Sequence, residues 1–130
     1  MLNFIKRYPF SIVVAFISFV LFVMPTNGLE VAQVACCDKI VHLLIYFTLV
    51  VAIFWDKFRV SRGTFNMFKI LIIMFAATLF GAFIEIIQFF LPYRSASLYD
   101  LLADLLGAFI GIIVCKIVMY KKIMNNAKKR

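Results

Sequence analysis

Four long apolar blocks leave little of this chain for anything other than helices in a membrane. They run over about residues 8–24, 40–55, 70–91 and 98–120. A helix needs about 20 apolar residues to cross the roughly 30 Å hydrocarbon core of a bilayer, and each block approaches that length. The sequence therefore predicts an all-α, polytopic membrane protein, built as a bundle of four transmembrane helices.

The composition supports this class and excludes a soluble one. Of the 130 residues, 65% are hydrophobic, and the mean hydropathy is +1.05. A soluble domain of this size is nearer half apolar, because it has too little interior to bury more. We expect a single transmembrane domain over residues 1–130, with no soluble domain beside it.

The basic residues set the expected orientation. Lys6 and Arg7 precede the first block, four basic residues lie between the second and third, and five follow the fourth. The other two connections offer only Lys39 and Arg94. The positive-inside rule therefore places both termini in the cytoplasm. The basic residues form no stripe with interleaved aromatics, so we expect membrane lipids and no nucleic acid as partners.

Polar residues gather at the opposite, outer level of the predicted bundle. Helical spacing gives each of the last three blocks one polar stripe there, and a stripe facing lipid costs several kcal/mol per charge. The stripes should therefore face one another around an outward-opening pocket. The candidate ligand-binding residues are Asp38, Lys39, His42, Tyr46, Glu85, Gln88, Arg94, Ser97, Asp100 and Asp104.

Small residues on the same faces predict where the helices pack. Gly81, Gly107 and Gly111 are expected to let neighbouring helices approach closely, as small residues do in membranes. Ser97 precedes the fourth block directly and is expected to cap its N-terminus.

The polar residues leave three classes of function open. In a binding protein, Arg94 and Lys39 would hold a phosphate or carboxylate, and the deeper residues would take hydroxyl, amine or cation groups. In an enzyme, His42 would act as general base and Glu85 as acid, although no known catalytic spacing appears. In a structural or accessory subunit, His42 would only hold the bundle, by a hydrogen bond to Glu85 or Asp100. The pattern favours binding over catalysis.

A metal ion is an alternative occupant of this cluster. Zinc prefers more histidines or cysteines than one, whereas calcium and magnesium prefer oxygen ligands alone. The sequence therefore predicts no metal and no cofactor.

Two segments resemble a known family. They are DKIVHLLIYF, residues 38–47, and EIIQFFLPYRSASLYDLLADLLGAFIG, residues 85–111. Their order and spacing resemble the VanZ-like family of small bacterial membrane proteins. At the position of Asp104 members commonly have Asn, so this chain adds a charge there.

The resemblance implies a multi-pass protein of the bacterial cytoplasmic membrane. The family's namesake lowers susceptibility to the glycopeptide teicoplanin, which links the family to antibiotic resistance and the cell envelope. Together with the predicted pocket, the resemblance favours recognition of a phospholipid headgroup or a lipid-linked cell-wall intermediate.

Overall fold

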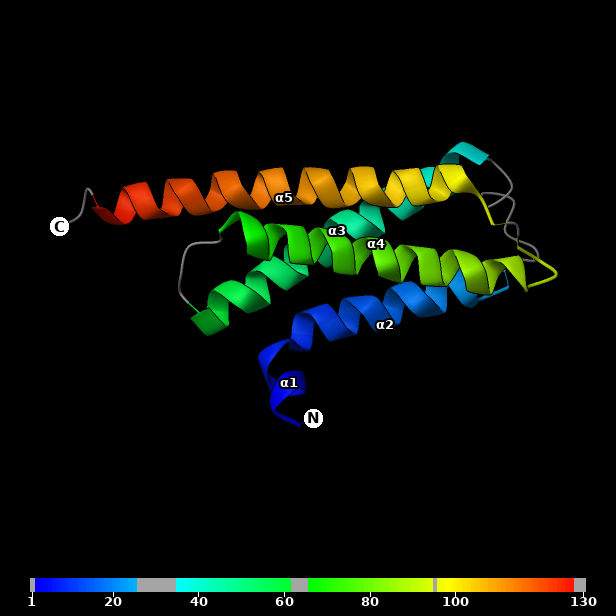
Figure 1. Cartoon of the computed structure of the whole chain (residues 1–130), viewed down its shortest axis with the longest axis horizontal. Helices are drawn as coiled ribbons and strands as arrows, with labels where there is room; N and C mark the ends of the chain where they lie inside the picture. Colours follow the sequence, from blue (N-terminus) through cyan, green and yellow to red (C-terminus); the bar gives the residue numbers. More distant parts are fainter. Residues whose placement is uncertain (1, 26–34, 62–65, 95, 128–130) are drawn as a thin grey trace.

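The computed structural model describes residues 2–25, 35–61, 66–94 and 96–127, and within them it contains helices and no strand. The all-helical class predicted from the sequence is confirmed. Consecutive long helices run antiparallel, side by side, in one elongated bundle (Figure 1). The helices are α1 (Leu2–Arg7), α2 (Pro9–Val23), α3 (Ala35–Ser61), α4 (Met67–Phe89) and α5 (Leu98–Ala127).

Three of these helices, α3, α4 and α5, are long and apolar enough to cross a membrane. α2 has 15 residues, and at 1.5 Å per residue it rises only about 22 Å, less than the hydrocarbon core. Pro9 begins α2 and ends α1 at the residue before Tyr8, since a residue preceding proline disfavours helical backbone. The structure thus confirms a multi-span helical protein, with three helices of spanning length in its described part.

The outer surface of the bundle is apolar, as a lipid environment requires. Large side chains such as Phe16, Phe75, Phe83 and Ile117 are each more than half exposed or close to it. In water, so large an apolar surface would drive aggregation. These side chains face the space that lipid tails would fill.

The closest helix packing joins α3 and α5. A Cβ atom added at Gly107 would collide with the backbone carbonyl oxygen of Leu43. One turn further along α5, a Cβ at Gly111 would lie 3.1 Å from the carbonyl oxygen of Phe47. The two glycines therefore lie where the helix backbones approach most closely, which positions the polar residues at the start of both helices.

α2 is held at its N-terminal end by a carboxylate from another helix. Asp56 of α3 is fully buried and accepts hydrogen bonds from the backbone N–H and the hydroxyl of Ser11, at 2.8 and 2.7 Å. The first N–H groups of a helix have no partner within the helix. Asp56 therefore caps α2 from outside and fixes it against α3.

Candidate functional site

The predicted site residues meet at one end of the bundle. The antiparallel arrangement brings the C-terminal ends of α2 and α4 beside the N-terminal ends of α3 and α5 (Figure 1). Asp38, Lys39 and His42 lie in the first turns of α3, and Asp100 and Asp104 in the first turns of α5. We call the set of predicted polar residues at this end the polar cluster.

Two ion pairs form the rim of the polar cluster. The Arg94 guanidinium, in the α4–α5 connection, lies 3.4 Å from the Asp38 carboxylate of α3. The Lys39 ammonium of α3 lies 3.5 Å from the Asp100 carboxylate of α5. The Lys39 side chain is 38% exposed whereas that of Asp100 is 4% exposed, so a surface lysine neutralises a buried acid.

Deeper in the cluster, His42 and Asp104 form a fully buried pair. The His42 Nδ1 atom lies 2.9 Å from Oδ1 of Asp104, and both residues are at most 1% exposed. The Phe22 ring of α2 stacks on the imidazole, with 4.1 Å between ring centroids, and helps to close it off. The interhelical bond expected for His42 is present, but Glu85 and Asp100 were the wrong partners. The partner is Asp104, one helical turn deeper on α5 than Asp100.

Glu85 joins α4 to the start of α5. Its carboxylate accepts a hydrogen bond from the backbone N–H of Ser97 at 2.9 Å. The Ser97 hydroxyl in turn accepts from the backbone N–H of Tyr99 at 3.2 Å, the bond that an N-capping serine makes. Ser97 therefore acts as the helix cap that the sequence predicts, and nothing in its contacts assigns it to a ligand.

Three residues near the end of α4 cap the last carbonyl groups of α2. Gln88 donates to the carbonyl of Phe22 at 3.2 Å, and the Tyr93 hydroxyl donates to that of Val23 at 2.9 Å. Arg94 donates to the carbonyl of Leu21 at 3.2 Å. The last four carbonyls of a helix lack partners within it, so these bonds dock α2 on the corner between α4 and α5. Gln88, placed among the binding residues from the sequence, makes a structural contact here.

Several buried polar atoms in the cluster have no hydrogen-bond partner. They are Nε2 of His42, the hydroxyl of Tyr46, Oε1 of Glu85, Nε of Arg94, Oδ1 of Asp100, which has only its ion pair with Lys39, and Oδ2 of Asp104. A buried polar atom without a partner costs about 1–3 kcal/mol. Natural proteins rarely leave several such atoms together, so this pattern is suited to a ligand, an ion, a shared proton or a buried water.

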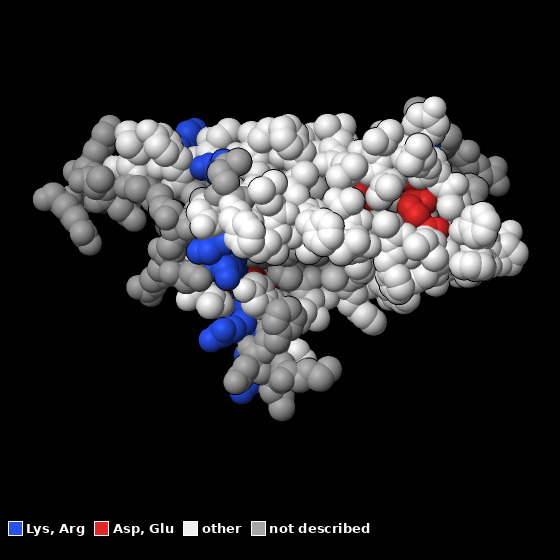
Figure 2. All heavy atoms as spheres, in the orientation of Figure 1, with Lys and Arg blue, Asp and Glu red and all other residues white. Residues whose placement is uncertain are grey.

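The surface charges divide between the two ends of the molecule (Figure 2). Acidic atoms are visible between α4 and α5 at the end that holds the polar cluster, and basic side chains collect at the opposite end. Lys57, Arg59 and Lys69 belong to that opposite end. The polar cluster is thus partly open to the surface, between two helices.

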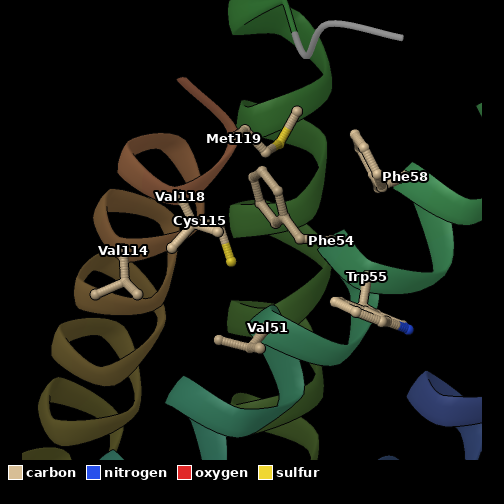
Figure 3. Close-up of a pocket in the computed structure, with 8 residues that line it drawn as sticks. All are labelled: Val51, Phe54, Trp55, Phe58, Val114, Cys115, Val118 and Met119. Carbon is tan, nitrogen blue, oxygen red and sulfur yellow. The ribbon is translucent and has the colours of Figure 1, made fainter. Parts of the chain in front are cut away.

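Two hollows in the described part of the chain lie away from the polar cluster. One, of about 230 Å³, lies between α3 and α5 and is lined only by apolar side chains and Cys115 (Figure 3). Phe54 and Trp55 of α3 and Met119 of α5 are among the residues around it. The other, of about 240 Å³, includes Lys57 and Lys69. Neither hollow is the outward pocket expected from the sequence, which stays a prediction.

Two residues that shape the polar cluster and the docking of α2 were not predicted from the sequence. Phe22, which covers His42, is one of 16 phenylalanines and carries no distinguishing signal. Asp56 directly follows the second apolar block as an acid among basic neighbours, and that isolated charge was the available signal. Its partner Ser11 is 45 residues away, so the contact itself depends on the fold.

The chain is similar to one protein family and to one curated protein. The family model described as VanZ/LLP1 matches residues 1–119. An uncharacterized protein of Schizosaccharomyces pombe is 31% identical over 77 residues, which cover 59% of this chain and 45% of that protein. The chain therefore spans less than half the length of that curated relative. No solved structure matches the chain.

Proposed function

The chain belongs to the VanZ/LLP1 family, and we propose that its polar cluster recognises the headgroup of a phosphate-bearing lipid at the outer membrane face. The observation that carries the proposal is the rim of the cluster. There, Lys39 is more than one third exposed beside the buried Asp100, and Arg94 of the α4–α5 connection pairs with Asp38, the residue before Lys39. Cations at the rim, level with the lipid headgroups in the proposed orientation, are suited to a lipid phosphate.

The proposed orientation rests on the distribution of charge. The basic end, with Lys57, Arg59 and Lys69, would face the cytoplasm under the positive-inside rule, so the polar cluster would face outward. In that arrangement α2 is a membrane span in addition to α3, α4 and α5, which makes four. Both termini are then cytoplasmic, and the protein is multi-pass in a bacterial cytoplasmic membrane. The short α2 fits this role because its ends are capped by Asp56 and by the α4–α5 corner.

The two rim cations would play different roles. Arg94 already donates to Asp38 and to the Leu21 carbonyl, so its guanidinium is fixed and contributes mainly positive charge. Lys39 pairs with the buried Asp100, but its side chain is 38% exposed, so a phosphate can approach the ammonium from the surface while that pair is kept. Lys39 is therefore the residue that we assign to direct contact with the headgroup.

The organism of the similar protein favours a common phospholipid over a lipid-linked cell-wall intermediate as the ligand. The relative in Schizosaccharomyces pombe belongs to a eukaryote, which makes no peptidoglycan precursor, whereas phospholipids occur in every membrane. In a bacterium, a lipid-linked cell-wall intermediate carries the same phosphate chemistry. Its binding at this site would connect the protein to the cell envelope and to teicoplanin susceptibility.

Native mass spectrometry of the detergent-purified protein tests this function. Wild type is expected to retain co-purifying phospholipid, and Lys39→Gln is expected to retain about tenfold less, since a charge-assisted hydrogen bond contributes about 1.5 kcal/mol. Lys69→Gln removes the same charge at the opposite end and should behave as wild type. Equal retention by all three proteins would refute the assignment.

The buried His42–Asp104 pair favours one second candidate, an enzyme acting on a lipid-linked phosphate or glycan. An imidazole oriented by a carboxylate at 2.9 Å is the arrangement of a general base. Turnover of a labelled lipid-linked phosphate by wild type, abolished in His42→Ala, would support this candidate. Turnover that survived the substitution would exclude His42 as the base.

A further inference from the structure

The carboxylates of the polar cluster are unequally neutralised. Asp38 and Asp100 each pair with a basic residue, as described above. Among the described residues, neither Glu85 nor Asp104 forms an ion pair with a lysine or an arginine. Two carboxylates therefore remain without a fixed cation, in a region where an uncompensated charge costs several kcal/mol.

These two carboxylates converge on the same histidine. His42, Glu85 and Asp104 each present one ligand atom, and the three atoms lie within 4.8 Å of one another. Ligand atoms around an ion at about 2.1 Å are separated by about 3.4 Å in tetrahedral geometry, so small side-chain rotations would close the set. His42 and Asp104 are buried, which shields the position from bulk water.

Tyr46 supplies an independent observation at the same position. Its hydroxyl is fully buried and has no hydrogen-bond partner. A Cβ atom added at Gly81 would lie 2.8 Å from Oδ2 of Asp104 and 3.2 Å from the Tyr46 hydroxyl. Both unpartnered oxygens therefore face the space that the missing side chain of Gly81 leaves beside them.

From these contacts we infer that His42, Glu85 and Asp104 bind one divalent cation of the manganese or zinc type, with the Tyr46 hydroxyl beside it. A dication matches the charge of two carboxylates that have no lysine or arginine partner among the described residues. Manganese accepts carboxylate oxygen and zinc accepts both oxygen and imidazole nitrogen, so one nitrogen and two carboxylates suit this class. A single histidine is enough for such an ion, because Glu85 and Asp104, which have no lysine or arginine partner in the described part of the chain, lie around it.

A second set of ligand atoms at His42, formed with Asp38 and Asp100, is the weaker site. Both of its carboxylates already have a basic partner, so a dication there would compete with Arg94 and Lys39. The contrast between the two sets supplies a matched control. Asp38→Asn removes a carboxylate near His42 without touching the inferred site.

The inference does not require a lipid, so metal binding by the purified full-length protein tests it alone. Metal is stripped with a chelator, and binding of Mn²⁺ alone and then of Zn²⁺ alone is measured by equilibrium dialysis with elemental analysis. Wild type is expected to bind one ion per chain. Glu85→Gln and Asp104→Asn should each weaken binding at least tenfold, while Asp38→Asn stays within about twofold of wild type.

The elution profile on size exclusion and the helical circular dichroism report folding of each variant. Half-buried Glu85 is expected to tolerate glutamine, so Glu85→Gln decides the outcome where Asp104→Asn fails to fold. Folded wild type that binds neither ion would overturn the inference. A shared proton or a buried water would then be the partner of the polar atoms that have no hydrogen bond. Equal losses in Asp38→Asn and Glu85→Gln would overturn the assignment of the ligands.

Discussion

Replacing Gly107 by alanine tests the helix crossing on which the polar cluster depends. The added methyl group would collide with the Leu43 carbonyl oxygen, and it would lie 2.9 and 3.0 Å from the carbonyl carbon and Cα of Leu43. All three are backbone atoms, which cannot rotate away. To reach ordinary contact distances, α3 and α5 would have to separate by about an ångström.

The expected loss of stability is the difference between two effects. Overpacking costs about 1–3 kcal/mol, and a rigid backbone contact belongs at the upper end of that range. Alanine in place of glycine returns up to about 1 kcal/mol through its better helix propensity. The net destabilisation of Gly107→Ala is therefore about 2 kcal/mol. For Gly111→Ala, the 3.1–3.3 Å contacts include the yielding Val50 side chain, and the two effects nearly cancel.

Thermal unfolding in a mild detergent, followed by circular dichroism, measures the difference. At about 3–5 °C per kcal/mol for a chain of this length, Gly107→Ala should lower Tm by about 6–10 °C, and Gly111→Ala by less than about 3 °C. Gly107 lies one turn from Asp104, so metal binding should weaken in the same variant. Equal Tm values for both variants and wild type would refute the close crossing.

Three further substitutions separate the stability of the fold from the chemistry of the cluster. Asp56→Ala removes both hydrogen bonds to Ser11 and should lower the free energy of unfolding by about 2–3 kcal/mol, against about 1 kcal/mol for Ser11→Ala. Neither substitution should change lipid retention. Unchanged Tm values would show that the cap contributes nothing. Gly81→Ala fills the space facing Asp104 and Tyr46 and should weaken Mn²⁺ binding at least tenfold. Its Tm should fall by less than that of Gly107→Ala. Mn²⁺ binding equal to that of wild type would place the ion elsewhere.

The sequence predicts the helices and the gathering of polar residues well, because both depend on local periodicity. Apolar blocks of spanning length form helices in lipid, and a stripe of charges must turn away from lipid. That reasoning brings His42, Asp100 and Asp104 to one end of the bundle without knowledge of the packing.

Pairing within the cluster depends on helix rotation and crossing, which periodicity does not give. His42 pairs with Asp104 and not with Asp100, because the close approach at Gly107 sets the register of α3 against α5. Whether α2 spans the membrane, and which residues cap it, likewise depend on contacts such as Asp56 with Ser11, 45 residues apart. The packing of the Phe22 ring of α2 over the imidazole depends on the fold in the same way.

The central claim, that the rim of the cluster recognises a lipid phosphate, is tested most directly by comparing two lipids that differ only in that group. Phosphatidic acid and diacylglycerol with identical acyl chains would be titrated against the purified protein in the same micelles, using wild type and Lys39→Gln. The account predicts that wild type binds the phosphate-bearing lipid about tenfold more tightly, and that this preference largely disappears in Lys39→Gln. Equal affinities of wild type for the two lipids would contradict it.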